Sequence, residues 1–254
     1  MFYDINEMKK VIILLFICIV YSCKEVQKPL TAQNIIDKAI LTSGGALYKD
    51  HKVSFSFRGK KYVSDRSNDK QVLKRITLLD TLKITDVKSV NSFERYFNDS
   101  LVSVPDSMVN RYANSVNSVH YFSRLPFGLN DKAVKKELLG ETTIKNKEYY
   151  KIKVTFSQEN GGDDYDDTYI YWFNKKTFNP DYLAYEFHVD GGGIRFREAY
   201  NERYIENIRF VDYTNLKPKQ KENSIYKVDS LYINDGLQLL SKIELDSIKV
   251  TPIN

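Results

Sequence analysis

The chain has 254 residues, of which 42% are hydrophobic and 28% are charged. These values are ordinary for a globular protein, and they exclude global disorder and a polytopic membrane protein. The formal net charge is +5, and the basic residues are interleaved with acidic ones without a Lys/Arg block, which excludes a typical nucleic-acid-binding surface.

The first element in chain order is a short apolar segment. Met8-Lys9-Lys10 precedes ten uncharged residues, 11–20, whereas a membrane-spanning helix needs about 20 apolar residues. The pattern therefore predicts an export signal over residues 1–22, with Met8 as the more natural start because two acids precede the basic pair. The alternative is a short buried helix, but no amphipathic pattern continues beyond the segment.

Val20-Tyr21-Ser22-Cys23 resembles the lipobox of bacterial lipoproteins, although Tyr21 stands where a small residue is more usual. The resemblance implies that the signal is cleaved after Ser22 and that Cys23 carries a diacylglycerol. Acyl chains of this kind give stable membrane anchoring. Cys18 would leave with the signal, so the mature domain would hold no free thiol and no disulfide, which excludes cysteine and redox chemistry.

Residues 23–30 are predicted to form a polar tether, and a helix is expected to follow it. Thr31 is a suitable N-cap, and Gly44-Gly45 is a suitable end. The apolar positions between them recur at helical spacing: Ile35, Ile36, Ala39 and Ile40.

From His51 the hydrophobic period changes to two, which indicates a half-buried strand with Val53, Phe55 and Phe57 on one face. The same alternation recurs over residues 150–156. A third instance covers residues 182–189, with Leu183, Tyr185, Phe187 and Val189 on the apolar face and Tyr182, Glu186 and His188 on the other. Turn residues separate such strands by about 8–12 residues, as in a meandering antiparallel sheet.

A second helix is predicted after Pro105, where Met108, Tyr112, Val116 and Val119 recur at helical spacing up to Leu125-Pro126. The predicted fold class is therefore β-rich α+β. It consists of one large curved antiparallel sheet, an unclosed half-barrel, covered on its concave side by about two helices. No linker divides the chain, so residues 31–254 are expected to form a single domain.

The order of lipobox, tether, helix and Val53-Ser-Phe-Ser-Phe-Arg-Gly59 strand resembles the half-barrel of the periplasmic lipoprotein carrier and its relatives. Three later stretches are similar to an uncharacterised family of lipoproteins from the Bacteroidota: Gly161-Gly-Asp-Asp-Tyr-Asp-Asp-Thr-Tyr-Ile-Tyr-Trp172, Gly191-Gly-Gly-Ile-Arg-Phe-Arg-Glu-Ala-Tyr-Asn201 and Val211-Asp-Tyr-Thr-Asn215. The family has no established activity, so the resemblance implies a fold and an envelope location but no catalytic residues.

Five residues are candidates for ligand binding. Residues 169–173 are apolar on both strand faces, so this strand either is central in a filled core or lines an apolar cavity, with Trp172 and Tyr185 as lining candidates. Arg195 and Arg197 share a strand face and either pair with acids across the sheet or hold an anionic headgroup. The chain has no sequence motif of a serine hydrolase or a metallohydrolase. His188 with Glu186, near these arginines in the sequence, is therefore its best candidate for an acid/base pair.

Two other motifs have simpler explanations. The acids of residues 163–167 do not follow EF-hand spacing, so a solvated turn is favoured over a calcium site. Gly191-Gly192-Gly193 lies between two strand patterns and does not open a helix, so a tight reversal is favoured over a phosphate-binding loop. We therefore expect no metal and no cofactor.

The leading hypothesis is a non-enzymatic protein of the bacterial envelope, anchored by lipid to a membrane, with the outer membrane favoured and a periplasmic or surface orientation left open. Its apolar groove would bind a lipid or an acylated protein. The alternative is a tethered scaffold with a filled core and no small ligand. An unrecognised hydrolase, which requires Glu186, His188 and Arg195 to converge in a cleft, ranks third.

Overall fold

The computed structural model describes residues 29–66, 70–159, 165–188, 191–222 and 224–253. The chain divides into two units, residues 1–30 and residues 31–254. The predicted signal, Ser22 and Cys23 lie outside the described residues, as do Asp163 and Asp164 of the acidic turn.

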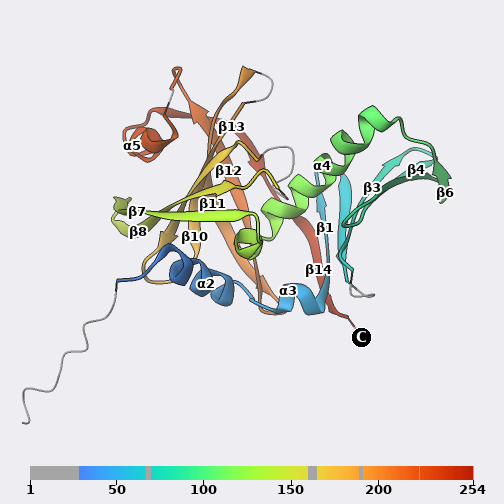
Figure 1. Cartoon of the computed structure of the whole chain (residues 1–254), viewed down its shortest axis with the longest axis horizontal. Coiled ribbons are helices and arrows are strands. Elements are labelled where there is room, and N and C mark those ends of the chain that lie inside the picture. Colours follow the sequence, from blue (N-terminus) through green and yellow to red (C-terminus); the bar gives the residue numbers. More distant parts are fainter. Residues whose placement is uncertain (1–28, 67–69, 160–164, 189–190, 223, 254) are drawn as a thin grey trace, which may run out of the picture. The chain divides into compact units, whose positions relative to one another are not determined.

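The described strands form two antiparallel sheets of seven strands each (Figure 1). The first sheet has the order β14-β1-β2-β3-β4-β5-β6. Its strands are β1 (His51–Phe57), β2 (Lys60–Asp65), β3 (Val72–Leu79), β4 (Leu82–Lys88), β5 (Phe93–Phe97), β6 (Ser100–Val102) and β14 (Asp246–Pro252).

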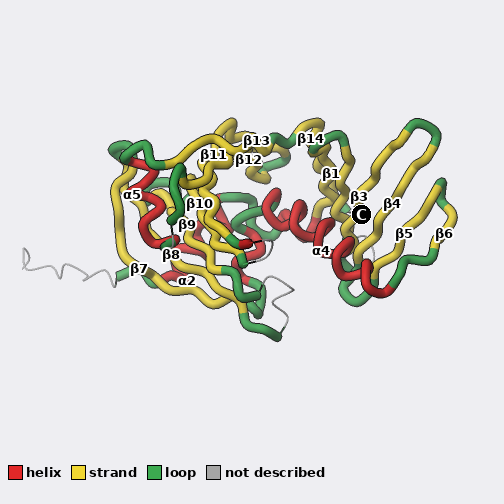
Figure 2. The backbone as a smooth tube through the Cα atoms, turned by 90° about the horizontal axis from the view of Figure 1, so that it is seen from above, coloured by secondary structure: helices red, strands yellow, loops and turns green. Residues whose placement is uncertain are grey.

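The second sheet has the order β13-β12-β11-β10-β9-β8-β7. Its strands are β7 (Val134–Ile144), β8 (Lys147–Phe156), β9 (Thr168–Asn174), β10 (Pro180–Phe187), β11 (Gly193–Ile205), β12 (Ile208–Pro218) and β13 (Leu237–Ile243). Neither sheet closes on itself. The predicted fold class, β-rich with an unclosed antiparallel sheet and few helices, is confirmed, and hydrogen bonding divides the strands between two sheets (Figure 2).

Both predicted helices are present. Helix α2 (Ala32–Thr42) begins with a capping box, in which Thr31 and Asn34 each accept from the other's backbone N–H, and it buries Ile35, Ile36 and Ala39. Helix α4 (Asp106–Ser123) packs against β3, β4 and β5 of the first sheet. Shorter helical segments are α3 (Leu47–Asp50), η1 (Phe127–Asn130), η3 (Ile225–Lys227) and α5 (Val228–Ile233).

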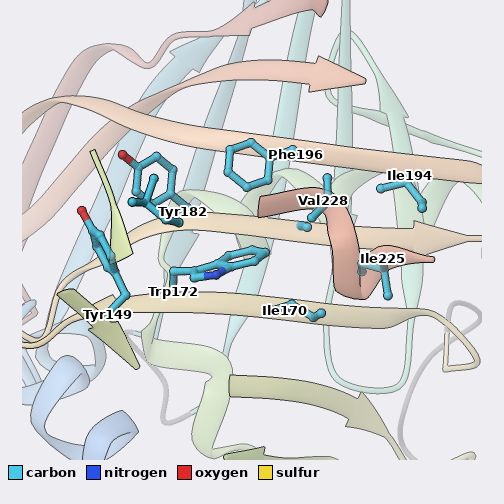
Figure 3. Close-up of a cluster of buried hydrophobic side chains, with 10 residues drawn as sticks. Tyr149, Ile170, Trp172, Tyr182, Ile194, Phe196, Ile225 and Val228 are labelled. Atoms are coloured by element: carbon cyan, nitrogen blue, oxygen red, sulfur yellow. The ribbon is translucent and has the colours of Figure 1, made fainter. Parts of the chain in front are cut away.

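The central strands of the second sheet are buried on both faces, which the strand alternation did not predict. Tyr182 was expected on the exposed face of β10, but this prediction is wrong, because Tyr182 and Ala184 are buried. They belong to a cluster with Trp172 and Phe196 that Ile225 of η3 and Val228 of α5 cover (Figure 3). The helices therefore do not all lie on one side of the sheet.

The first sheet carries a buried ion network under α4. Asp86 on β4 lies opposite Arg75 on β3 and Arg95 on β5. Its two carboxylate oxygens accept from Arg75 at 3.0 and 2.6 Å and from Arg95 at 2.7 and 3.2 Å. Since Asp86 is only 2% exposed, the network holds three strands together away from water.

Candidate ligand-binding interior

The strand register decides which predicted site residues share a face. Tyr185 of β10 pairs with Arg195 of β11, and Leu183 pairs with Arg197, so Tyr185, Arg195 and Arg197 lie on one face of the second sheet. Trp172 pairs with Tyr182 and is fully buried in the cluster on the other face (Figure 3). The structure therefore brings three of the five candidates together and separates Trp172 from them.

The acid/base candidates do not converge. Glu186 pairs with Ile194, the residue before Arg195, so its side chain lies on the opposite face from that arginine. His188 is exposed beyond the end of β10. Within the described ranges there is also no group of three or more acids, histidines or cysteines arranged to hold a metal ion.

Arg197 lies between the second sheet and the end of α4. Its Nη2 donates to the hydroxyl of Tyr185 at 3.3 Å, and its guanidinium lies 5.4 Å from the ring centroid of Phe122. The Tyr185 ring stacks on Tyr169 at 5.6 Å. The Nε of Arg197 is buried without a hydrogen-bond partner in the described part of the chain.

Two further arginines of this interior were missed by the sequence analysis. Arg209 of β12 is 1% exposed, and only its Nη2 is paired, with Glu202 at 3.3 Å. Its Nε and Nη1, and the Nε of Arg124 after α4, are buried without a partner among the described residues. The one available signal was an arginine within the apolar run of residues 208–211.

Electrostatic interactions connect these arginines through two buried tyrosines. Burial raises the pKa of Tyr48, and the charges of Arg209 and Arg124 oppose that rise. Burial likewise raises the pKa of Tyr213, opposed by Arg209 and Arg197. The three guanidiniums therefore act on a shared interior, which we call the arginine interior (Arg124, Arg197 and Arg209 with Tyr48 and Tyr213).

Buried polar atoms around the arginine interior lack hydrogen-bond partners among the described residues, and they include one acceptor, the Oδ1 of Asn215 opposite Arg197. Burial lowers the pKa of Arg124, and Asp131 opposes this shift without forming an ion pair with it. The hydroxyls of Tyr121 and Tyr171 are also buried without a well-formed hydrogen bond to a described residue. Buried donors without acceptors are destabilising, so an anion entering here would gain hydrogen bonds that the folded chain does not supply.

A cavity of about 20 Å³ adjoins Arg124. Its walls are mainly apolar and include Val53, Phe55, Phe127 and Phe210. The volume corresponds to about one water molecule. In this conformation the interior is therefore closed, and any ligand with an acyl chain requires it to open.

His120 of α4 lines this cavity and predicts a pH dependence of stability. Its Nε2–H donates to the Lys74 carbonyl at 3.1 Å, and burial lowers its pKa to about 4, with Arg124 acting in the same direction. Below the unfolded pKa of about 6.5 the unfolded chain takes up a proton that the folded chain does not. Stability should therefore fall as the pH drops from about 6.5 to 4, by up to about 3 kcal/mol.

The measurement is urea unfolding at several pH values for the parent chain and for His120→Gln, which keeps an N–H donor but cannot titrate. The variant should lose this part of the slope between pH 6.5 and 4. His188→Gln, at an exposed histidine, is the matched control and should leave the slope unchanged. Equal slopes for the parent and His120→Gln would contradict the prediction.

Comparison with protein-family models gave one match, which covers residues 9–245 and so nearly the whole chain. The chain belongs to the family of unknown function DUF6503. The resemblance to an uncharacterised family is thus confirmed, and DUF6503 membership brings no activity with it. Comparison with curated protein sequences found no match.

Several solved structures are similar to this DUF6503 chain. A LolA superfamily protein from Nitrosomonas europaea has 12% identity and a TM-score of 0.46, with 87% of this chain and 94% of that chain covered. A DUF1329 family protein from Desulfovibrio piger has 11% identity and a TM-score of 0.49, with 87% and 93% covered. A lipoprotein-sorting protein domain from Vibrio parahaemolyticus has 8% identity and a TM-score of 0.45, with 87% and 92% covered. At such identities, the ligands of those proteins say nothing about the ligand of this chain.

Proposed function

We propose that this protein is a non-enzymatic, lipid-anchored protein of the bacterial envelope whose arginine interior binds an amphipathic ligand. The ligand is a lipid or an acylated partner that carries an anionic group. The observation that carries the proposal is a set of three arginines, Arg209 buried and Arg124 and Arg197 half-buried, each with a buried guanidinium nitrogen that has no partner among the described residues. Of the three, only Arg209 forms an ion pair in the described part of the chain, with Glu202.

The chemistry of the arginine interior matches such a ligand in two parts. A carboxylate or phosphate accepts two hydrogen bonds from one guanidinium fork, which would satisfy the unpaired nitrogens of Arg197 and Arg209. The surrounding aromatic walls, including Phe122 and Phe127, offer apolar surface to an acyl chain. Ligand entry requires the end of α4 and η1 to move away from β12, because the present cavity is too small.

Membrane attachment is the second part of the proposal and depends on Cys23. The lipobox-like Val20-Tyr21-Ser22-Cys23 supports a lipid on this residue, and residues 24–30 provide a short tether to the folded unit. No helix in the described ranges is long and apolar enough to cross a bilayer. We place the anchor in the outer membrane.

One observation favours a second candidate function, a tethered scaffold that acts through its surface. The cavity beside Arg124 has room for about one water molecule, as expected if the core is permanently filled. In that case the arginines would donate to internal water, and no ligand would be retained on purification.

Native mass spectrometry of residues 24–254, purified gently from a bacterial envelope fraction, separates the two candidates. Ligand binding predicts a bound mass the size of one lipid molecule that is lost on denaturation. Arg197→Met should lower its occupancy, whereas Arg58→Met, at an exposed arginine of the β1–β2 turn, should not. A clean mass of the bare chain in repeated preparations would favour the scaffold.

A further inference from the structure

A second hollow, distinct from the arginine interior, lies between α4 and the first sheet. Its volume is about 350 Å³, and it is open to solvent. Four of its nine lining residues are cations, Lys60, Arg75, Arg95 and Arg111, and Asp86 is the one acid, which leaves a net charge of +3. We call it the cationic hollow. Its size and charge suit a small anionic group.

The floor of the cationic hollow is held in place. Asp86 fixes both Arg75 and Arg95, and Arg75 also donates from Nη1 to Ser115 Oγ at 2.6 Å. The Arg95 guanidinium lies 3.8 Å from the ring centroid of Tyr112 on α4. Two guanidiniums are thus preorganised by contacts from both the sheet and the helix, which reduces the ordering cost of binding an anion.

The rim of the cationic hollow carries the surplus charge. Lys60 at the start of β2 and Arg111 on α4 both line it, and neither forms an ion pair with a carboxylate of the described residues. Because Asp86 is already shared by two arginines, the positive charge of the rim remains available to an anionic ligand. A phosphate group accepts hydrogen bonds from several donors at once and matches this arrangement.

Exposed apolar side chains adjoin the cationic hollow. Ile84, which lines it, pairs with Thr77 on β3 and with Phe97 on β5. On the same face of the sheet as the hollow, the hairpin ends present Leu79 at 54% exposure and Phe97 at 38%. Leu78 and Leu101 are exposed on the opposite face of the same two hairpins. Apolar residues gathered beside a cationic hollow are typical of a surface that meets the headgroup and acyl boundary of a bilayer.

We propose that the cationic hollow binds the phosphate of an anionic lipid headgroup while the β3–β4 and β5–β6 hairpins contact the bilayer surface. This contact is separate from the lipid on Cys23 and from the arginine interior. It would hold the first sheet against an anionic membrane, where each nearby basic residue strengthens association.

The test is vesicle flotation of residues 24–254, which lack the anchor and contain the whole unit 31–254. Vesicles of phosphatidylglycerol and phosphatidylethanolamine are compared with vesicles of phosphatidylcholine. Binding is expected only to the former. The double variant Lys60→Glu, Arg111→Glu should weaken it by about tenfold or more. The control Lys61→Glu, Lys70→Glu makes the same change in net charge at exposed sites outside the hollow and should have at most about a twofold effect.

Two comparisons test the proposal: one between the two double variants, and one between binding to vesicles and binding to glycerol phosphate. Equal losses for both double variants would show attraction by net charge alone and would overturn the hollow. Titration with glycerol phosphate identifies the source of the phosphate. Leu79→Ser with Phe97→Ser, on the face of the hollow, should reduce vesicle binding and leave glycerol phosphate binding unchanged, whereas glycerol phosphate binding without vesicle binding would overturn the lipid assignment. Native mass spectrometry of the Lys60→Glu, Arg111→Glu variant measures the occupancy of a ligand in the arginine interior, which these two substitutions do not alter.

Discussion

Replacement of Asp86 by alanine is expected to lower the free energy of unfolding by about 3–5 kcal/mol. Asp86 is buried between Arg75 and Arg95 and accepts four hydrogen bonds from them. Removing its carboxylate leaves two guanidiniums without their counter-charge, one of them buried. Urea unfolding followed by circular dichroism measures the effect.

Two control variants test whether the loss of stability comes from the buried ion network. Asp99→Ala removes an exposed ion pair with Lys83 and should change stability by less than about 1 kcal/mol. The triple variant Arg75→Met, Asp86→Leu, Arg95→Met replaces the whole network by apolar side chains and should recover most of the loss. If Asp86→Ala costs no more than Asp99→Ala, the network is hydrated and does not hold the three strands together.

Replacement of Trp172 by alanine is expected to destabilise the second sheet by about 3–5 kcal/mol. The indole is fully buried, packs edge to face on Phe196 at 5.5 Å and donates from Nε1 to Asp229 at 3.2 Å. The same Asp229 oxygen accepts from Lys151 at 2.7 Å, so the change leaves a cavity and weakens the attachment of α5. Because Trp172 is the only tryptophan, unfolding is followed by circular dichroism.

Trp172→Phe is the graded control. It keeps an aromatic ring against Phe196 and loses the hydrogen bond to Asp229, so it should cost about 1–3 kcal/mol. Leu239→Ala, at an exposed position of β13, should cost less than about 0.5 kcal/mol. If Trp172→Ala instead spares stability and abolishes a ligand seen by native mass spectrometry, then Trp172 lines a binding site and the cluster of Figure 3 is not a filled core.

Local sequence patterns were sufficient to predict those helices and strands whose signals lie within the element itself. The Thr31 cap and the stripe through Ile35 and Ile36 predict α2, because capping and amphipathic spacing lie within one helix. Alternation predicts β1 with Val53, Phe55 and Phe57 buried, since one face of that strand meets the core. Of the five ligand-binding candidates, Tyr185, Arg195 and Arg197 share a face, as alternation along β10 and β11 implies.

The remaining features depend on contacts between distant segments. Tyr182 is buried because α5, more than 40 positions later, covers its face, and nothing in the pattern of β10 reports that helix. Asp86 lies 11 positions from Arg75 and 9 from Arg95, and only the strand register shows that they meet. The sequence did not predict Arg124 and Arg209 as members of the arginine interior for the same reason. Their proximity depends on how α4 packs near β12, which neither segment reports alone.

The position of β1 between β2 and β14 determines when the first sheet can be completed. Val53 pairs with Ser64 on one side and with Val250 on the other. The first pairing needs only a short loop, whereas the second joins segments about 200 residues apart and is therefore expected to form late in folding. Until then β1 presents an unpaired edge, which is a template for association with other chains. Pairing with β14 covers this edge, so a chain that lacks residues 246–252 is expected to associate with other chains through β1.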